Sequence, residues 1–190
     1  MKYLIEHLDP KLFPWSLIEY KHLSKMVGKN NLIFTNVREK HERSKLSSFG
    51  KVYAERLSEL IKTELKGKRI CLMDAGAGKK LSPADTFDVL VFGGILGDNP
   101  PQNRTMKELG SLGLQTRNLG DKQMPTDNAV LAAYRITGGT PFQKLDFVDE
   151  IEIEIDKGES IILPFRYMVE QGKICVSDDL ITYIKKNGFT

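Results

Sequence analysis

Cysteine and histidine are scarce in this chain of 190 residues, which argues against a disulfide-rich protein and against a zinc protein. The two cysteines, Cys71 and Cys175, both lie inside apolar stretches and are expected to be free thiols rather than part of a disulfide framework. The three histidines, His7, His22 and His41, have no close spacing to one another or to the cysteines. We therefore expect no zinc site and no other bound metal.

Long hydrophobic runs and a strong charge of one sign are also missing. No apolar run approaches the roughly 20 residues that a membrane span needs, and no signal-peptide pattern follows Met1. The formal net charge of +3 is too small to indicate a nucleic-acid binder by itself, although it allows a local basic patch. The composition is typical of a soluble globular protein, and we expect a cytoplasmic one with no membrane partner.

What the chain does contain is an alternation of short apolar strands and amphipathic helices. Strands are predicted over residues 1–7, 31–36, 69–74, 88–94, 113–120 and 147–156, with a further apolar segment over 160–168. Helices are predicted over 14–27, 51–65, 105–112, 125–137 and 177–187, with Ser177 as the cap of the last one. This alternation predicts an α/β fold with a mainly parallel sheet and helices on both faces. Phe13 and Trp15, at the start of the first helix, are expected to pack in the core.

One segment, residues 38–50, differs from the rest in being strongly basic and poor in apolar residues. We expect it to be a mobile loop or the start of a solvated helix. It is the only soft boundary in the chain, which contains no repeat and no low-complexity stretch. The sequence therefore predicts a single domain over residues 1–190.

Two glycine-rich signals follow predicted strands, and the first is LMDAGAGKK. A strand followed by Asp74-x-Gly76-x-Gly78 matches the glycine loop of Rossmann-type methyltransferases, where glycine lets the backbone approach a ligand. The match is short, however, and the next predicted strand ends in glycines instead of the acidic residue that would hold ribose hydroxyls. We favour a simple turn here, with a Rossmann-type methyltransferase using Asp74–Gly78 as an alternative.

The second signal is spread over two loops, VFGGILGD and TRNLGDKQMPTD, each of which follows a predicted strand. Ligands of open parallel sheets lie beyond the carboxyl ends of the strands, so two such loops side by side predict a pocket. The glycines at 93, 94, 97 and 120 would leave peptide groups exposed for hydrogen bonds to a ligand. One such loop would be an ordinary strand-to-helix turn, but two favour a ligand site.

Three segments together resemble one known family: GGILGDNPPQNRT, LGDKQMPTDNAV and LPFRYMV. They are similar to the SPOUT-class methyltransferases of the family that includes the yeast arginine methyltransferase acting on a small-subunit ribosomal protein. The resemblance covers nearly the whole chain. This chain departs from the family in having a shorter region around residues 38–66 and in the glycine pair of DAGAG. It implies a C-terminal trefoil knot, a rare exception to unknotted chains, and S-adenosylmethionine as cofactor.

The resemblance also implies which residues bind the cofactor. They are expected to be Phe92, Gly93, Gly94, Ile95, Leu96, Gly97, Leu119, Gly120, Gln123, Met124, Pro164 and Phe165. The methyl group of S-adenosylmethionine is already activated, so the enzyme must mainly position the acceptor and exclude water.

Carboxylates near these loops are the candidates for catalysis. A charged guanidinium is a poor nucleophile, so its methylation needs carboxylates that orient it and accept a proton. Asp98 and Asp121 each follow a loop glycine, and Glu19 on the first helix is a third candidate; each could instead cap a turn or helix. Arg104 and Arg166 are expected to bind the substrate; the alternatives are that Arg104 stabilises the loop through Asp98 and that Arg166 forms a structural ion pair.

The resemblance leaves the acceptor open between a protein arginine and an RNA of the translation apparatus. For an RNA, the same acids would act as a base, and Arg104, Arg117 or the basic segment would hold phosphate. A non-catalytic RNA- or ribosome-binding module with the same fold is the alternative from another functional class. Many SPOUT enzymes dimerise through the knot, which allows a homodimer here.

Overall fold

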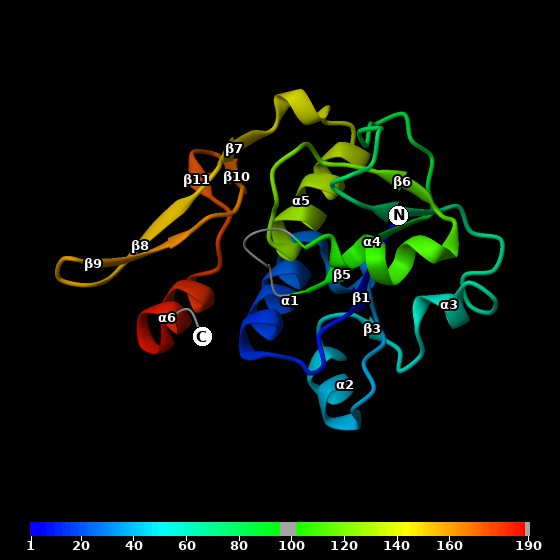
Figure 1. Cartoon of the computed structure of the whole chain (residues 1–190), viewed down its shortest axis with the longest axis horizontal. Coiled ribbons are helices and arrows are strands. Elements are labelled where there is room, and N and C mark those ends of the chain that lie inside the picture. The colour runs from blue at the N-terminus through cyan, green and yellow to red at the C-terminus, as the bar shows by residue number, and fades with distance from the viewer. Residues whose placement is uncertain (96–101, 189–190) are drawn as a thin grey trace.

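The computed structural model describes residues 1–95 and 102–188, and a parallel six-stranded sheet forms its centre (Figure 1). The strands are β1 (Lys2–His7), β2 (Leu32–Thr35), β3 (Lys51–Val52), β4 (Ile70–Met73), β5 (Val89–Gly94) and β6 (Gln115–Arg117). Their order is β3-β2-β1-β5-β4-β6, and every neighbouring pair is parallel. The helices are α1 (Pro14–Val27), α2 (Lys40–Leu46), α3 (Leu57–Leu60), α4 (Arg104–Leu109), α5 (Thr126–Thr137) and α6 (Asp178–Asn187), with short 3₁₀ turns at Lys29–Asn31, Gly110–Leu112 and Phe142–Lys144.

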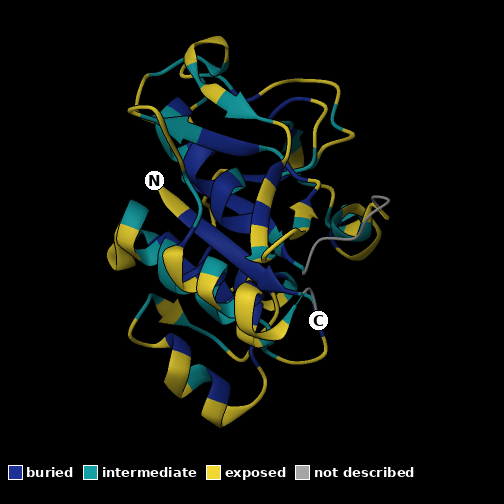
Figure 2. Ribbon diagram, turned by 90° about the vertical axis from the view of Figure 1, so that its left-hand side faces the viewer, coloured by how far each residue is buried: buried dark blue, intermediate teal, exposed yellow. Residues whose placement is uncertain are grey.

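The central strands bury side chains on both faces of the sheet. In β1, Tyr3 and Ile5 belong to the hydrophobic cluster beneath α1 and α5, whereas Leu4 belongs to the cluster that includes residues of α3 and α4. Successive side chains of a strand point to opposite faces, so a continuous apolar run fills two layers of core. Figure 2 shows the sheet buried between helices whose outer faces are exposed. The predicted α/β fold with helices on both faces is confirmed.

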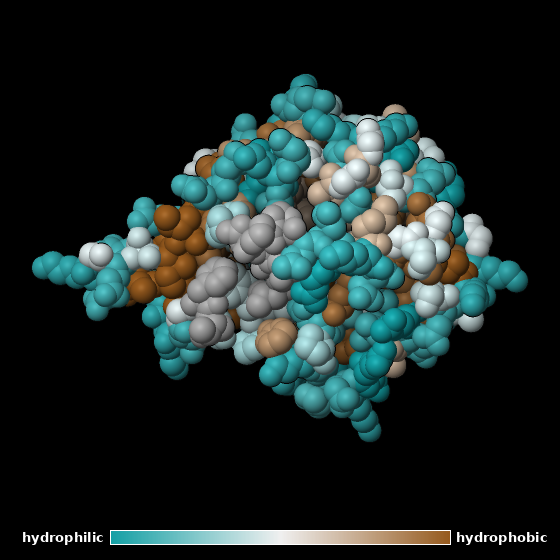
Figure 3. Space-filling model, in the orientation of Figure 1, coloured by the Kyte–Doolittle hydropathy of each residue, from teal (hydrophilic) through white to brown (hydrophobic). Residues whose placement is uncertain are grey.

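Two small antiparallel sheets extend the C-terminal part of the chain. One contains β7 (Asp146–Val148), β10 (Tyr167–Glu170) and β11 (Lys173–Ile174), and the other is the hairpin of β8 (Ile151–Asp156) and β9 (Glu159–Leu163). The hairpin projects away from the central sheet, and hydrophobic surface lies over it in Figure 3 (compare Figure 1). Its inner face packs on α6, which also contacts α1. These elements enclose a third hydrophobic cluster, which contains Trp15 and Phe165. Segments far apart in the sequence therefore meet here.

Two predicted elements were wrong because tertiary pairing overrides local pattern. The helix expected over 51–65 is divided into β3 and the short α3, since Lys51 pairs with Ile33 at the edge of the sheet. The strand expected over 147–156 is divided into β7 and β8, which pair with β10 and β9 respectively. Ser177 does occupy the cap position of α6, but its side chain makes no capping hydrogen bond.

The basic segment contains a helix rather than a loop. In α2, most residues are exposed, yet Leu46 is fully buried and Glu42 is nearly so. Glu42 Oε1 accepts a hydrogen bond of 2.8 Å from the backbone N–H of Leu12. The segment is therefore anchored to the body of the protein at two points, which its basic composition did not indicate.

Candidate active site

A cavity of about 470 Å³ opens at the carboxyl edge of the central sheet. Its lining comes from the end of β5, from residues 73–76 after β4, from residues 119–126 after β6 and from α1. The strand order changes direction between β1 and β5, and open α/β sheets bind ligands in a crevice at such a point. The volume is in the range of about 300–1,000 Å³ that is usual for small-molecule sites.

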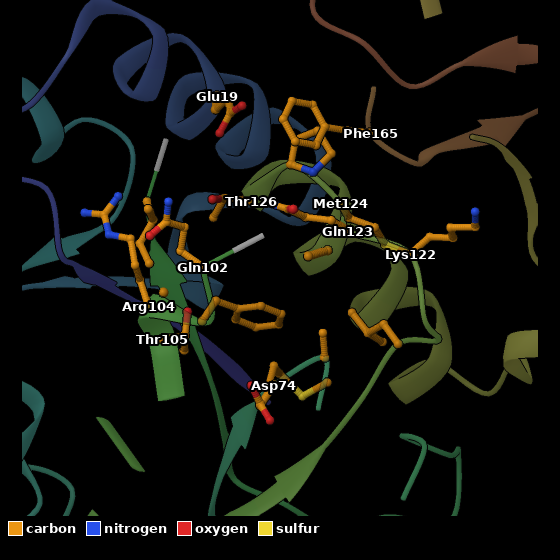
Figure 4. A pocket seen from close by; sticks show the side chains of 18 of the residues that line it. Glu19, Asp74, Gln102, Arg104, Thr105, Lys122, Gln123, Met124, Thr126 and Phe165 are labelled. Atoms are coloured by element: carbon orange, nitrogen blue, oxygen red, sulfur yellow. The ribbon is translucent and has the colours of Figure 1, made fainter. Parts of the chain in front are cut away.

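Both glycine-rich signals of the sequence belong to this one cavity. The two loops expected side by side are not neighbours, because β4 lies between β5 and β6. The Asp74 loop therefore lies between them, and Asp74, Ala75 and Gly76 line the cavity. The turn predicted there is present, with the Ala77 N–H donating to the Asp74 carbonyl at 3.1 Å. In Figure 4, Asp74 lies at the opposite end of the cavity from Glu19.

Some of the loop glycines line the cavity, and some allow neighbouring side chains to pack closely against the backbone. A Cβ added at Gly93 would overlap Thr105 Oγ1, and one at Gly94 would overlap Tyr20 Oη. Gly120 has a φ of +93°, in the left-handed region that favours glycine. Gly93 and Gly120 line the cavity, whereas Gly94 does not. The glycine at 94 is therefore explained by the close approach of α1 to the sheet.

Most of the predicted cofactor-binding residues do lie together. Those that line the cavity are Phe92, Gly93, Ile95, Leu119, Gly120, Gln123, Met124 and Phe165. Pro164 is exposed and, like Gly94, does not line it. Leu96 and Gly97 lie outside the described residues. The roles of all of these residues in cofactor binding stay predictions.

Glu19 is a buried acid in the cavity wall. It lies on α1 and is only 6% exposed, and its Oε1 accepts a hydrogen bond of 2.8 Å from the indole N–H of Trp15. Burial, and then the negative charge of Asp127, raise the pKa of Glu19 well above its ordinary value. Within residues 1–95 and 102–188, no lysine or arginine forms an ion pair with this carboxylate. A buried acid without a cation is unfavourable, so the site favours a ligand that brings one.

Asp127, in the helix predicted over 125–137, is a second buried acid, although it does not itself line the cavity. It is 2% exposed, and its Oδ2 lies 2.8 Å from Nδ1 of His22. Its Oδ1 accepts a hydrogen bond of 2.7 Å from the backbone N–H of Asn128. Asp127 thus has its own partners and acts on Glu19 through its charge.

The other two predicted catalytic acids differ from Glu19. Asp121 lines the cavity, but its side chain is 87% exposed and its Oδ1 lies 3.7 Å from Nη1 of Arg166. Asp98 lies outside the described residues. Of the two that the structure describes, Glu19 is the buried one.

The arginines considered for substrate or phosphate binding all form ion pairs. Arg104 lines the cavity, and its Nη2 donates to Oδ1 of Asp9 at 2.9 Å. Arg117 Nη2 donates to Asp85 at 2.7 Å. Arg166 does not line the cavity, and its Nε donates to Oδ1 of Asp149 at 2.6 Å. The ion pair that was the alternative for Arg166 is present; Arg104 pairs with Asp9, and its predicted partner Asp98 lies outside the described residues. Contact of these arginines with a substrate stays a prediction.

Within residues 1–95 and 102–188, no helix is long and apolar enough to span a bilayer. These residues also contain no group of three or more histidine, cysteine, aspartate or glutamate side chains placed to hold a metal ion.

The fold is that of the SPOUT class of methyltransferases. The crystal structure of the yeast arginine methyltransferase SFM1 complexed with SAM matches this structure with a TM-score of 0.88 and 33% identity, covering 100% of this chain and 92% of that one. The complex of SFM1 with SAH gives a TM-score of 0.86 and 33% identity, over 96% of this chain and 94% of that one. The dual specific Trm10 from Thermococcus kodakaraensis shares the fold alone, with a TM-score of 0.56 and 18% identity over 76% of this chain and 96% of that one.

The sequence comparisons define the family. The family described as protein arginine N-methyltransferase SFM1-like matches residues 2–189. The protein arginine N-methyltransferase SFM1 of Saccharomyces cerevisiae is 36% identical over 204 residues, which cover 98% of this chain and 95% of that protein. This chain belongs to the SFM1-like family, and the resemblance found in its sequence is confirmed.

Proposed function

We propose that this chain is an S-adenosylmethionine-dependent protein arginine methyltransferase that acts on a component of the translation apparatus. The observation that carries the proposal is the buried carboxylate of Glu19 in the wall of the cavity, in a chain of the SFM1-like family. A cavity that contains a buried acid favours a cationic acceptor, and arginine stays charged at any physiological pH. A nucleobase would bring no such cation to the buried acid, so the protein acceptor is favoured.

The residues present fit the cofactor. The cavity combines apolar side chains, such as Phe92, Leu119 and Met124, with glycine segments at 93 and 120 that leave peptide groups accessible. Such a lining suits an adenosine, whose ring needs apolar contact and whose polar edges need backbone partners. When bound, S-adenosylmethionine supplies a methyl group already activated by its sulfonium sulfur. By resemblance to the SPOUT class, we also propose that residues 92–95, 118–124 and part of 162–167 belong to the loops of a trefoil knot; residues 96–98, which the resemblance also assigns to the first loop, lie outside the described residues.

Glu19 has the environment of a proton acceptor for arginine methylation. Burial raises the pKa of Glu19 in the protein alone, and the charge of the incoming guanidinium would lower it, so that the carboxyl releases its proton to solvent and accepts hydrogen bonds from the guanidinium. As a guanidinium nitrogen takes the methyl group, and the bond from that group to sulfur breaks, the nitrogen passes a proton to the Glu19 carboxylate. The indole N–H of Trp15 holds Oε1, which fixes the orientation of the carboxylate. Asp121, at the exposed side of the cavity, is the second acid of the proposal and would orient the substrate chain.

Calorimetric titration with S-adenosylhomocysteine tests the cofactor assignment. The wild-type protein is expected to bind it, and Gln123→Trp, which would fill the cavity from the loop after β6, is expected to abolish binding. Gln143→Trp is the matched control, because Gln143 is exposed and does not line the cavity. Equal binding by both variants would place the cofactor elsewhere.

Transfer of a labelled methyl group tests the acceptor. The protein is incubated with labelled S-adenosylmethionine and a ribosomal fraction, which is then treated with a proteinase or with a ribonuclease. We expect the labelled macromolecule to be degraded by the proteinase alone. Label degraded by the ribonuclease would favour the RNA acceptor. No label in either fraction, together with strongly salt-dependent RNA binding, would favour the non-catalytic module.

A further inference from the structure

Aromatic side chains from separate elements line the same end of the cavity as Glu19. Trp15 comes from α1, Phe165 from the connection between β9 and β10, Tyr167 from β10 and Tyr183 from α6. The first three are buried members of one hydrophobic cluster, and Tyr183 packs against it. Figure 4 shows Glu19 and Phe165 toward one end of the cavity and Asp74 toward the other. The buried acid Glu19 and this aromatic cluster therefore belong to the same part of the cavity wall.

A carboxylate among aromatic rings is an arrangement suited to a desolvated cation. One oxygen of Glu19 is held by the indole of Trp15, and no lysine or arginine of the described ranges pairs with the carboxylate. Aromatic faces attract cations most strongly where water is excluded, as it is around these buried rings. Nearby, the ring of Phe13 already carries such a contact, with Lys11 Nζ 5.2 Å from its centroid.

Tyr167 adds an independent observation that points to a ligand. Its side chain lines the cavity and is 1% exposed, and within the described ranges its buried hydroxyl has no hydrogen-bond partner. Burial, and then the charges of Asp127 and Glu19, raise the pKa of Tyr167, so this hydroxyl lies in the same acidic field. Buried polar groups without partners are rare in native proteins. A donor from a ligand would satisfy it.

The shape of the cation follows from these groups. A guanidinium is planar, offers five N–H donors at its edge and stacks its faces on aromatic rings. Its edge can donate to Glu19 and to Tyr167 while its faces contact the rings. The ammonium of lysine is a compact and strongly hydrated charge with no face to stack.

We propose that Trp15, Phe165, Tyr167 and Tyr183 form an aromatic subsite that takes the guanidinium of the acceptor arginine and selects it over lysine. This inference rests on the proposed function, because it identifies the part of the cavity that receives the acceptor. It assigns to Trp15 a role in acceptor binding in addition to core packing. Phe165 of this subsite lies, like Glu19, toward the opposite end of the cavity from Asp74 (Figure 4).

The fluorescence of Trp15 tests the subsite directly, because it is the only tryptophan in the chain. Protein saturated with S-adenosylhomocysteine is titrated with N-acetylarginine amide, N-acetyllysine amide and the neutral isostere N-acetylcitrulline amide. The arginine probe is expected to change the fluorescence saturably, with an affinity at least roughly tenfold above that of either other probe. Equal affinity for the lysine probe, or no saturable change with the arginine probe, would overturn the proposal.

A pair of phenylalanine variants provides the matched control. Phe165→Leu keeps an apolar side chain but removes the ring, and is expected to weaken arginine binding roughly tenfold and to raise KM more than it lowers kcat. Phe49→Leu, at a partly buried ring that does not line the cavity, is expected to leave both unchanged. Thermal melting checks that each variant folds, and Tyr183→Leu replaces Phe165→Leu if the latter does not. The same affinity in the subsite and control variants would contradict the subsite.

Failure of the subsite and failure of the proposed function give different results. Methyl transfer to arginine with an unchanged KM in Phe165→Leu would leave the function standing and overturn the subsite. Arginine binding that depends on Phe165, without any methyl transfer to arginine, would overturn the function and support the subsite.

Discussion

At the scale of single residues, burial distinguishes the acids of the site. Glu19 and Asp121 both line the cavity, but Glu19 is 6% exposed, whereas the side chain of Asp121 is 87% exposed. Burial and the neighbouring charge of Asp127 raise the pKa of Glu19 well above its ordinary value, and a carboxylate of higher pKa accepts a proton more effectively. Of the two, Glu19 therefore has the environment of a base.

Glu19→Gln is expected to lower kcat for arginine methylation by about 10²- to 10⁴-fold. The amide oxygen can still accept the hydrogen bond from Trp15, so the variant is expected to bind S-adenosylhomocysteine as the wild type does in calorimetry. Glu154→Gln, on the exposed face of β8, is the control and should not change kcat. An unchanged rate in Glu19→Gln would show that another group accepts the proton.

The pH dependence of the rate reports the same residue. Protonated Glu19 has no site for the proton of the acceptor, so kcat/KM, which reports the free enzyme, should fall as pH is lowered through its pKa. Because that pKa is raised, the fall is expected at a pH above the ordinary carboxyl value of 4.5. The pH–rate profile of the wild type measures it, and a fall only near the ordinary value would contradict the assignment.

At the scale of elements, α2 shows how a short polar-looking segment is held in place. Leu46 is fully buried in the larger core cluster, while Lys45 beside it is exposed. We expect Leu46→Ala to lower the free energy of unfolding by about 2–5 kcal/mol and Lys45→Ala to change it by less than about 0.5 kcal/mol. Urea denaturation compares the two. Equal values would mean that α2 is not part of the cooperative fold.

Elements whose pattern is local were predictable, and those defined by distant partners were not. The apolar runs of β1 and β5 bury both faces, and α1 has Pro14 at its start and Gly28 at its end, so each signal lies within the element itself. By contrast, β3 exists because Lys51 pairs with Ile33, and nothing near residue 51 reports that partner.

The candidate site divides in the same way. The glycine loops at 93 and 120 stand out in the sequence because few other residues fit those backbone positions. Trp15 and Tyr167 share the cavity only because α1 and β10 meet in the third core cluster, more than a hundred residues apart along the chain. The effect of Asp127 on the pKa of Glu19 could not be predicted from the sequence, because it depends on the packing of α5 against α1.

At the scale of the whole molecule, the buried carboxyl of Glu19 lowers the stability of the folded protein at high pH, and the proposed function explains why it is present. A carboxyl whose pKa is raised on folding contributes stability at low pH, and this contribution is lost as pH rises through its folded pKa. Glu19→Gln cannot ionise and so does not lose this stability. Its Tm is therefore expected to exceed that of the wild type at pH 8, and the difference in Tm is expected to be smaller at pH 5. For a chain of this size, each kcal/mol corresponds to roughly 2–4 °C in Tm. A variant that melts below the wild type at pH 8 would contradict this account.

Identification of the methylated residue tests the central claim most directly. Ribosomal proteins are incubated with labelled S-adenosylmethionine and either the wild type or Glu19→Gln, hydrolysed, and analysed by mass spectrometry. The account predicts labelled methylarginine with the wild type and none above background with Glu19→Gln. Methyllysine or a methylated nucleotide as the labelled product, or equal methylarginine from both proteins, would contradict it.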